Sequence, residues 1–330
     1  MNSNKPQRLV YFNGELIPEK EAKISIYDSA LMFGDMVFEM TRSFNKKQFK
    51  LKEHIKRLYS GIKILRIPID ISPEELENAC YATIEANNHL FNEDDEHRLM
   101  IDISRGLLSI YEGIDGINSG PNIIIADFPL RWTVRNMGQL FDNGINAVIT
   151  SQRAIPSYLL DPKIKNRSRI HYLMANIEAS QIEGSNNWAL MLDLEGHITE
   201  GSGDNFFIIE NNKVISPEPR NMLRGISRDY VMNTLCPELG IEVIEKNIDA
   251  YDVYNAEEAF MTGTPFCMLP VTSLNGNKIG SGEVGPIFNK ILKKWSLNTK
   301  VDISAQIKNW DKENLQNISE APSPYNFKNK

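Results

Sequence analysis

Residues 161–179, DPKIKNRSRIHYLMANIEA, decide how the rest of the chain is interpreted. Basic side chains crowd this stretch just before an apolar helix, at Lys163, Lys165, Arg167, Arg169 and His171. Neighbouring positive charge favours the neutral form of a lysine amine, and a neutral amine attacks a carbonyl to give a Schiff base. The stretch therefore indicates either a nucleophilic lysine or a solvated basic turn, and other parts of the sequence must separate the two.

The composition is that of a globular protein. With 330 residues, 42% hydrophobic and 24% charged, the chain is expected to form one large or two ordinary domains. Its formal net charge of -7 argues against general affinity for nucleic acid. The widely spaced Cys80, Cys236 and Cys267 form no CxxC or Cys/His cluster, so neither a metal site nor a disulfide framework is indicated. Without an apolar leader or membrane-spanning run, we expect a cytoplasmic location.

Strand and helix patterns alternate irregularly along the chain. Asn13-Gly14 between LVYF and ELIP predicts a hairpin. An apolar stripe over residues 55–65 predicts a helix, and Ser72-Pro73 followed by Glu75 predicts a second helix with a capping box. Strands dominate without a βαβ repeat, so the predicted fold class is α+β rather than doubly wound.

The domain division is predicted from a break in the strand pattern. We expect a small N-terminal domain over residues 1–128, an interdomain linker over 129–137 and a larger domain over 138–300. Residues 301–330 are polar and end in APSPYNFKNK, which predicts a surface-bound or disordered tail.

Further stretches carry side chains that could bind an anionic, flat ligand. Arg57 in LKEHIKRL could hold a phosphate, and Glu200 in ITEGSGDNFF could keep a ring nitrogen protonated. Ile226-Ser227 begin a helix, where backbone N–H groups favour an anion, and Thr264 follows a glycine in MTGTPF. Each feature is a weak signal by itself, because an ordinary surface arginine, turn acid, helix cap or turn would have the same residues.

The order of these stretches resembles that of the class IV aminotransferases. This pyridoxal-phosphate family of fold type IV includes branched-chain aminotransferases, D-amino-acid aminotransferases and aminodeoxychorismate lyase. The resemblance runs from Val10 to Trp295, and it rests on YFNGELIP, SALMFGDMVFE, FKLKEHIKRL, ITEGSGDNFF, MLRGISRD and AEEAFMTGTPFCMLPV. It implies a two-domain fold, with a small N-terminal α/β domain and a larger C-terminal strand-rich α/β domain that binds pyridoxal 5'-phosphate. It also implies a homodimer.

The resemblance gives each matching residue an implied role. The Schiff-base lysine falls on Lys165 rather than Lys163, by the count back from Glu178-Ala179. Arg57 matches the phosphate-binding arginine, and Glu200 matches the glutamate that pairs with the pyridine nitrogen. Further phosphate contacts are implied for Ile226, Ser227 and Thr264, where serine keeps the hydroxyl of the family's threonine.

The implied activity is transamination between an amino acid and a 2-oxo acid such as 2-oxoglutarate or pyruvate. Lys165, once displaced from the cofactor, would serve as the general base at the substrate Cα. Two alternatives remain: an aminodeoxychorismate lyase that releases pyruvate, which shares the cofactor residues, and a non-catalytic binding protein. The expected partners are small molecules rather than nucleic acid or a membrane.

The substrate-binding positions differ from the family's familiar patterns. Branched-chain enzymes usually carry Tyr-x-Arg before Thr-Arg-Gly, and here the corresponding residues are Arg98 and Met100. The Arg-x-His pair of well-known D-amino-acid enzymes is also missing from LLSIYEG. Phe33 and Phe38 match pocket-lining positions, which implies an apolar pocket.

Arg98 is the candidate cation for the substrate carboxylate, because an unpaired carboxylate in an apolar pocket is strongly unfavourable. The alternative is a surface strand arginine that pairs with Asp94 or Asp95. Since the arrangement differs from that of the branched-chain enzymes, the prediction leans towards D-amino acids over branched-chain L-amino acids.

Overall fold

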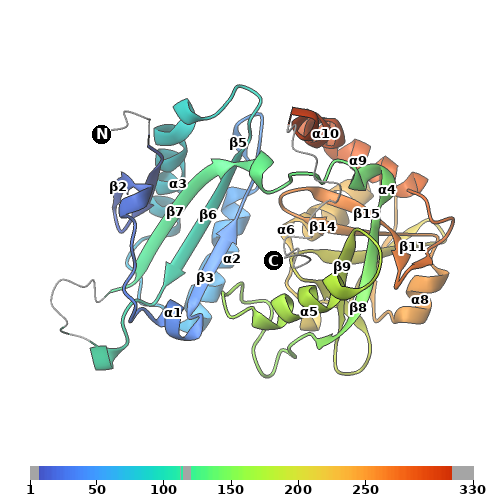
Figure 1. Ribbon diagram of the computed structural model, residues 1–330, viewed down its shortest axis with the longest axis horizontal. Coiled ribbons are helices and arrows are strands. Elements are labelled where there is room, and N and C mark those ends of the chain that lie inside the picture. The colour runs from blue at the N-terminus through green and yellow to red at the C-terminus, as the bar shows by residue number, and fades with distance from the viewer. Residues whose placement is uncertain (1–6, 112, 114–119, 314–330) are drawn as a thin grey trace. The chain divides into compact units, whose positions relative to one another are not determined.

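The computed structural model describes residues 7–111, 113 and 120–313, which form two compact units (Figure 1). The first unit runs to Leu130 and also includes Ile164–Arg169. The second comprises Arg131–Lys163 and the residues from Ile170 onward. Each unit has its own β-sheet with helices, so the predicted two-domain α+β organisation is confirmed.

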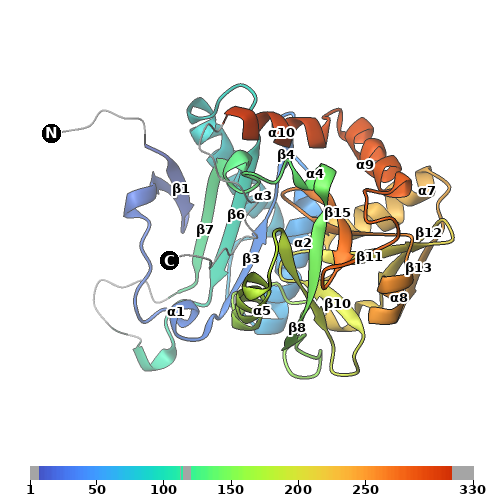
Figure 2. The ribbon, with the colours of Figure 1, turned by 45° about the vertical axis from the view of Figure 1, so that its right-hand side comes forward.

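The first unit is a mixed helix and strand domain whose sheet runs in the order β2-β1-β7-β6-β3. Its strands and helices are β1 Leu9–Phe12, β2 Glu15–Pro18, α1 Ser29–Phe33, β3 Met36–Met40, β4 Ser43–Phe44, β5 Lys47–Gln48, α2 Leu51–Leu65, α3 Pro73–Asn87, β6 His97–Ser104 and β7 Asn122–Pro129. Helices α2 and α3 cover one face of this sheet (Figures 1 and 2). The β1–β2 hairpin turns at Asn13 and Gly14, whose φ angles of 50° and 103° suit these residues.

The two helices predicted in the first unit are confirmed as α2 and α3, and the structure shows what stabilises each. The apolar stripe of α2 buries Ile55, Leu58 and Ile62 against the sheet. At the start of α3, the Ser72 hydroxyl accepts from the backbone N–H of Glu75, whose carboxylate accepts from the Ser72 N–H. This capping box satisfies backbone donors that a helix start otherwise leaves unpaired.

Alternation along β3 divides its side chains between two faces. Val37 belongs to the core under α2 and α3, so Phe38 and Met40 point to the other face. Phe38 lies opposite Asp102 of β6, and Met40 lies opposite Met100. The face away from the helices is therefore the one that carries Phe38.

The second unit is rich in strands, and its sheet runs β10-β9-β8-β15-β14-β11-β12-β13. Because β10 pairs with β11 as well as β9, part of the sheet closes into a barrel-like ring. The elements are α4 Leu140–Asn143, β8 Ile145–Arg153, α5 Ile170–Gln181, β9 Asn187–Leu192, β10 Ile198–Gly201, β11 Asn205–Glu210, β12 Lys213–Pro217, α6 Ile226–Tyr230, η6 Val231–Leu235, α7 Cys236–Glu238, β13 Val243–Lys246, α8 Ala250–Asn255, β14 Glu258–Gly263, β15 Cys267–Leu274, β16 Asn277–Lys278, α9 Pro286–Thr299 and α10 Ile303–Glu313. Helix α5 packs on β8 and β9 (Figure 2).

Helix α10 corrects the prediction of a polar tail from residue 301. Ile303, Ile307 and Trp310 form one apolar stripe and are at most 2% exposed. The carboxylate of Asp311 accepts from the backbone N–H groups of Asn136 and Gly138, at 2.6 and 2.7 Å. These buried side chains hold residues 303–313 against the second unit, and the rest of the predicted tail lies outside the described residues.

The division differs from the sequence prediction in another respect. Residues 164–169, which the sequence placed within the larger domain, group with the first unit. The reason is backbone pairing with β3, where Asn166 bridges Val37. Within the part of the chain that the structure describes, no helix is both long enough and apolar enough to cross a membrane.

Candidate active site

Lys165 lies on a short extended segment along the open edge of β3. The Phe38 N–H donates to the Lys165 carbonyl at 2.9 Å, and the Arg167 N–H donates to the Met36 carbonyl at 2.9 Å. Paired residues of neighbouring strands point to the same face, so Lys165 shares a face with Phe38. Its Nζ lies 4.7 Å from the centre of the Phe38 ring.

Two arginine side chains also lie near the Phe38 ring, beside Lys165. The guanidinium carbon of Arg167 lies 3.8 Å from the ring centre, and that of Arg169 lies 5.7 Å away. Arg167 is also paired with the mostly buried Asp102, at 2.7 Å. Phe38 itself is 5% exposed, so it forms a buried platform below the half-buried Lys165.

Lys163, the other candidate lysine, has local partners. Its Nζ lies 2.9 Å from the Asp161 carboxylate and donates to the Arg220 carbonyl at 3.2 Å. It belongs to the second unit, whereas Lys165 belongs to the first. These contacts are those of a structural surface lysine.

Arg57 is held by a buried carboxylate that the sequence analysis did not single out. Its Nε and Nη2 donate to the two carboxylate oxygens of Glu39, at 2.6 and 2.8 Å. On the same carboxylate, Glu39 Oε2 lies 2.7 Å from Nδ1 of His54. Glu39 is 0% exposed and His54 is 1% exposed. The bidentate pair fixes the plane of the Arg57 guanidinium.

The charges of this cluster depend on one another. Burial opposes ionisation of Glu39, but Arg57 and His54 together hold the pKa of its carboxyl well below its usual range. Burial lowers the pKa of His54, the Glu39 charge opposes that effect, and the positive charges of Arg57 and Lys165 lower the pKa further. Lys165 and Arg57 therefore both act on His54 within the first unit.

Arg98 is buried, which contradicts the alternative of a surface arginine paired with Asp94 or Asp95. Its side chain is 5% exposed, and Nη2 reaches the sulfur of Met40 at 3.5 Å. The pKa of its guanidinium is lowered to about 9. Burial is the main cause, and the nearby positive charge of Arg42 is the second. In the sheet, Arg98 lies opposite Phe128 of β7 and two residues before Met100, which pairs with Met40 of β3.

Phe33 is not in an enclosed pocket within this chain. It ends the short helix α1, which Asp28 caps by accepting from the Ala30 N–H at 2.7 Å. Gly34 then takes a left-handed φ of 69°, which turns the chain into β3. The Phe33 side chain is 64% exposed, so its place in a substrate pocket stays a prediction.

The predicted ring-nitrogen partner, Glu200, lies in the second unit at the end of β10. It is 4% exposed, and its Oε1 accepts from the Tyr172 hydroxyl at 2.7 Å and from the Leu223 N–H at 3.1 Å. Its Oε2 accepts from Nδ2 of Asn205 at 3.2 Å. Tyr172 and Asn205 thus orient Glu200. The sequence alone indicated no role for either residue.

Asn205 also connects Glu200 to the start of α6. Its Nδ2 donates to the Leu223 carbonyl at 2.9 Å, and a Cβ on Gly225 would lie only 2.0 Å from its Oδ1. Glycine at this N-cap therefore allows the close packing, and Ile226 and Ser227 follow it as buried first-turn residues. The half-buried Thr264 follows the end of β14.

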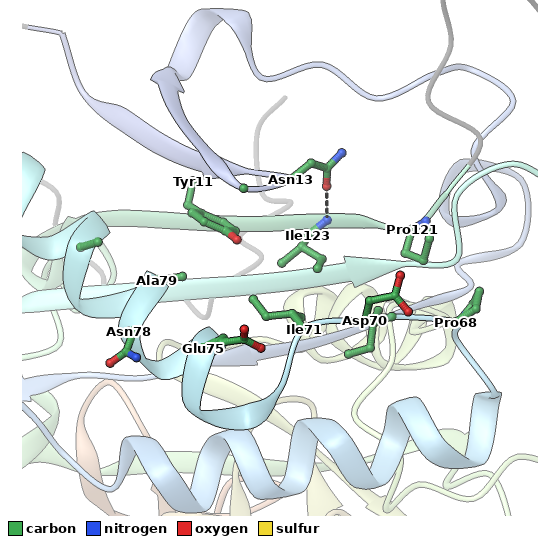
Figure 3. Close-up of a pocket in the computed structure, with 13 residues that line it drawn as sticks. Tyr11, Asn13, Pro68, Asp70, Ile71, Glu75, Asn78, Ala79, Pro121 and Ile123 are labelled. Carbon is green, nitrogen blue, oxygen red and sulfur yellow. Dashed lines mark hydrogen bonds between the residues drawn. The ribbon is translucent and has the colours of Figure 1, made fainter.

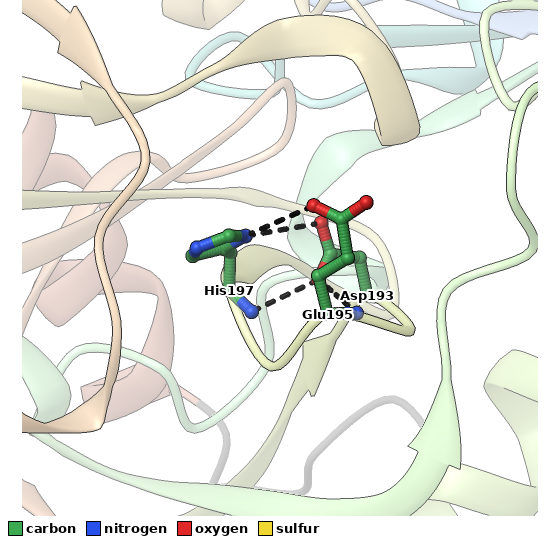
Figure 4. Close-up of side chains that lie close together, drawn as sticks. All are labelled: Asp193, Glu195 and His197. Carbon is green, nitrogen blue, oxygen red and sulfur yellow. Dashed lines mark hydrogen bonds and ion pairs between the residues drawn. The ribbon is translucent and has the colours of Figure 1, made fainter.

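Two other features of the molecule contain none of the predicted site residues. A pocket of about 640 Å³ in the first unit is lined by α3, the β1–β2 turn and the loop around Asp70 (Figure 3). In the β9–β10 turn, Asp193, Glu195 and His197 bring potential metal ligands within 4.8 Å of one another (Figure 4). Oδ1 of Asp193 already accepts from the backbone N–H groups of Glu195 and His197, so turn formation accounts for this cluster.

Residues 36–274 match the family described as amino-transferase class IV. The chain belongs to the class IV aminotransferases. A putative branched-chain-amino-acid aminotransferase of Methanocaldococcus jannaschii is 35% identical over 288 residues, which cover 87% of this chain and 94% of that relative.

Solved structures agree with this family assignment. The branched-chain amino acid aminotransferase of Escherichia coli has a TM-score of 0.78 at 29% identity, covering 87% of this chain and 93% of that one. The T.th. branched-chain amino acid aminotransferase complexed with N-(5'-phosphopyridoxyl)-L-glutamate has a TM-score of 0.75 at 27% identity, covering 92% and 98%. The predicted fold type IV architecture and pyridoxal-phosphate-dependent aminotransferase activity are therefore confirmed.

The residues of this class IV aminotransferase fit its cofactor by their chemistry. The first unit supplies an amine, Lys165, and a fixed guanidinium, Arg57, which suit an aldehyde and a phosphate respectively. The second unit supplies the buried carboxylate Glu200, which accepts hydrogen bonds from Tyr172, Asn205 and the Leu223 N–H. A buried carboxylate of this kind suits a protonated ring nitrogen.

Proposed function

We propose that this aminotransferase takes the amino group of branched-chain L-amino acids and delivers it to a 2-oxo acid such as 2-oxoglutarate, with Lys165 as its Schiff-base residue. The observation that carries the proposal is the placement of Lys165 above the buried Phe38 platform, on the same face as Arg98. The relatives reported above are named as branched-chain enzymes, which favours the branched-chain alternative over the predicted lean towards D-amino acids.

In the proposed reaction each residue has one task. Pyridoxal phosphate supplies an electron sink for the negative charge that develops at the substrate Cα. Lys165 would act as the general base that removes the proton from the substrate Cα. Glu200 holds the proton on the ring nitrogen, and Tyr172 and Asn205 hold Glu200 in place through the contacts described above.

The phosphate would be held by several groups, which we propose to be Arg57, Ile226, Ser227 and Thr264. Glu39 keeps the Arg57 guanidinium in one orientation, so less conformational freedom is lost when the phosphate binds. The backbone N–H groups at the start of α6 add favourable dipoles for an anion. Arg98 would neutralise a substrate carboxylate, and Phe38 would contact the apolar part of the site.

The competing lyase reaction is not favoured, because the relatives reported above are aminotransferases. We further propose that the enzyme is a cytoplasmic homodimer. Exposed apolar side chains around α1 support an interface there, since Ile26, Leu31 and Phe33 are 69%, 64% and 64% exposed. Cys80, Cys236 and Cys267 are buried and form no disulfide, which suits a reducing compartment.

A half-reaction screen tests the proposed substrate class. The purified holoenzyme is mixed with L-leucine, D-leucine, L-alanine or D-alanine, and loss of the absorbance band of the lysine-bound cofactor is followed. We expect L-leucine to react fastest and the product to be the matching 2-oxo acid. A clear preference for a D-enantiomer would contradict the substrate proposal, and release of pyruvate from aminodeoxychorismate would restore the lyase alternative.

Replacing Arg57 by alanine is expected to weaken cofactor binding. Loss of a charge-assisted phosphate contact costs about 1.5–3 kcal/mol, which corresponds to a roughly ten- to hundredfold rise in the cofactor dissociation constant. Reconstitution titrations of the apoenzyme measure the change. Lys56→Ala is the matched control, because it removes an exposed positive charge from the neighbouring position of α2. Overlapping titrations of wild type and Arg57→Ala would remove Arg57 from the phosphate site.

A further inference from the structure

The sheet face that carries Phe38 has several basic side chains and a single carboxylate. Its basic side chains are those of Arg98, Lys165, Arg167 and Arg169. Asp102 lies on the same face, opposite Phe38. Among residues 164–169 and the strands β3, β6 and β7, all of which the structure describes, Asp102 is the one carboxylate on this face. The partner that Asp102 takes therefore decides how charge is distributed around Lys165.

Arg167 takes this carboxylate by reaching across β3. Its backbone N–H donates to the Met36 carbonyl on the edge of β3, whereas Asp102 lies on β6, the strand on the other side of β3. The side chain spans this distance over the Phe38 ring, with its guanidinium carbon 3.8 Å from the ring centre. Its Nε and Nη2 both reach Oδ1 of Asp102, at 2.9 and 2.7 Å.

Lys165 extends over the same ring, so its amine is a neighbour of the Arg167 contact. Its Nζ lies 4.7 Å from the ring centre of Phe38. Lys165 pairs with Phe38 along one edge of β3, and Asp102 pairs with Phe38 along the other. The backbones of Lys165 and Asp102 are therefore two strand spacings apart, which is about 10 Å. A lysine and an aspartate side chain that point towards each other can span that gap.

The charge of Asp102 affects what the Lys165 amine can do. Burial raises the pKa of the Asp102 carboxyl, and the charge and hydrogen bond of Arg167 act against that rise. A carboxylate that faced Lys165 without another partner would stabilise its ammonium form. Only the neutral amine attacks a carbonyl, so an ion pair between Lys165 and Asp102 would oppose the linkage to the cofactor.

We propose that Arg167 is a positioning residue for Lys165, because it neutralises Asp102 and so prevents an ion pair between Asp102 and the Lys165 ammonium. The inference rests on the proposed role of Lys165 and adds a residue that acts on it through Asp102. Arginine suits this task, because its guanidinium stays charged at every working pH and its plane stacks on an aromatic ring. The contact with Phe38 shows that stacking.

The rate at which apoenzyme links to pyridoxal phosphate tests the proposal without measuring turnover. The cofactor is added over a range of pH, and the absorbance band of the lysine-bound cofactor is followed. At neutral pH we expect Arg167→Met to form the link about 10-fold or more slowly than the wild type. The midpoint of its pH profile should rise by roughly one unit or more, because a close opposite charge favours the ammonium by that amount. Arg167→Lys should lie between the two, since it keeps the charge but loses the planar contact.

Removal of the carboxylate as well should reverse the loss. The double variant Arg167→Met/Asp102→Asn is expected to form the link within about threefold of the wild-type rate, because the two residues act as a coupled pair. Arg169→Met is the matched control. It removes a positive charge whose carbon lies 5.7 Å from the same ring centre and leaves the Asp102 contact in place. Its pH midpoint should move less than that of Arg167→Met.

The contradicting outcomes are distinct. A wild-type rate and midpoint in Arg167→Met would overturn the proposal, because Asp102 would then have no effect on the amine. A double variant as slow as Arg167→Met would also overturn it, because Arg167 would then act through packing alone. Thermal unfolding of each apoenzyme checks folding, and Arg167→Lys keeps the test decisive if Arg167→Met is unstable. Failure of the wild type to form a link at Lys165 would instead contradict the proposed function.

Discussion

Lys165→Ala is expected to fold and to bind pyridoxal phosphate non-covalently, while losing nearly all transamination. The variant lacks both the amine that forms the linkage and the base at Cα, and the acid–base role alone is worth about 10²–10⁴-fold in rate. Steady-state assays and the absorbance spectrum of the reconstituted protein measure the two losses. Lys163→Ala is the matched control, two residues earlier, and its partners Asp161 and Arg220 are surface groups. Wild-type turnover in Lys165→Ala would remove Lys165 from the chemistry.

Glu200→Gln is expected to slow the reaction by roughly 10²-fold or more while leaving cofactor binding largely intact. A neutral amide cannot stabilise the protonated ring nitrogen, so the cofactor would accept negative charge from Cα less effectively. Single-turnover kinetics isolate this step, and a reconstitution titration reports binding. Glu195→Gln serves as the control, because Glu195 lies in the preceding β9–β10 turn with a 72% exposed side chain. If Glu200→Gln retains wild-type rates, Glu200 does not contact the ring nitrogen.

Much of the fold could be predicted because its causes are local in the sequence. The Asn13-Gly14 turn, the stripe of α2 and the capping box of α3 each depend on residues a few positions apart. The prediction of a polar tail was wrong at α10. Residues 301–330 are polar overall, but Ile303, Ile307 and Trp310 among them are apolar and buried. These side chains are spaced to form one helical stripe, and that spacing was a usable signal.

The residues of the candidate site differ in how far the sequence could predict them. Lys165 could be predicted because the resemblance to the class IV aminotransferases implies a Schiff-base lysine at a fixed count before the following helix. Glu39 and His54 could not, because their importance arises when β3 packs against α2 and closes a buried ionic cluster around Arg57. Asn205 was missed for a similar reason, since its two contacts join a strand to the turn that precedes α6.

Arg98 shows how burial changes the meaning of a residue. In the sequence it had two explanations, a carboxylate-binding group or a surface arginine beside Asp94 and Asp95. The structure excludes the second by burying the side chain to 5% exposure. The pairing of β6 with β3 then places Arg98 on the same sheet face as Phe38, whose ring Lys165 contacts. This neighbourhood cannot be read from the sequence of one strand.

Borohydride reduction of the holoenzyme, followed by peptide mapping, tests the central claim most directly. Reduction makes the bond between the lysine and the cofactor permanent, and mass spectrometry of the digest locates the pyridoxyl group. We predict a single modified peptide that spans residues 161–179, with the pyridoxyl group on Lys165. A pyridoxyl group on Lys163, or no covalent modification of a fully reconstituted protein, would contradict the assignment of Lys165 as the Schiff-base residue.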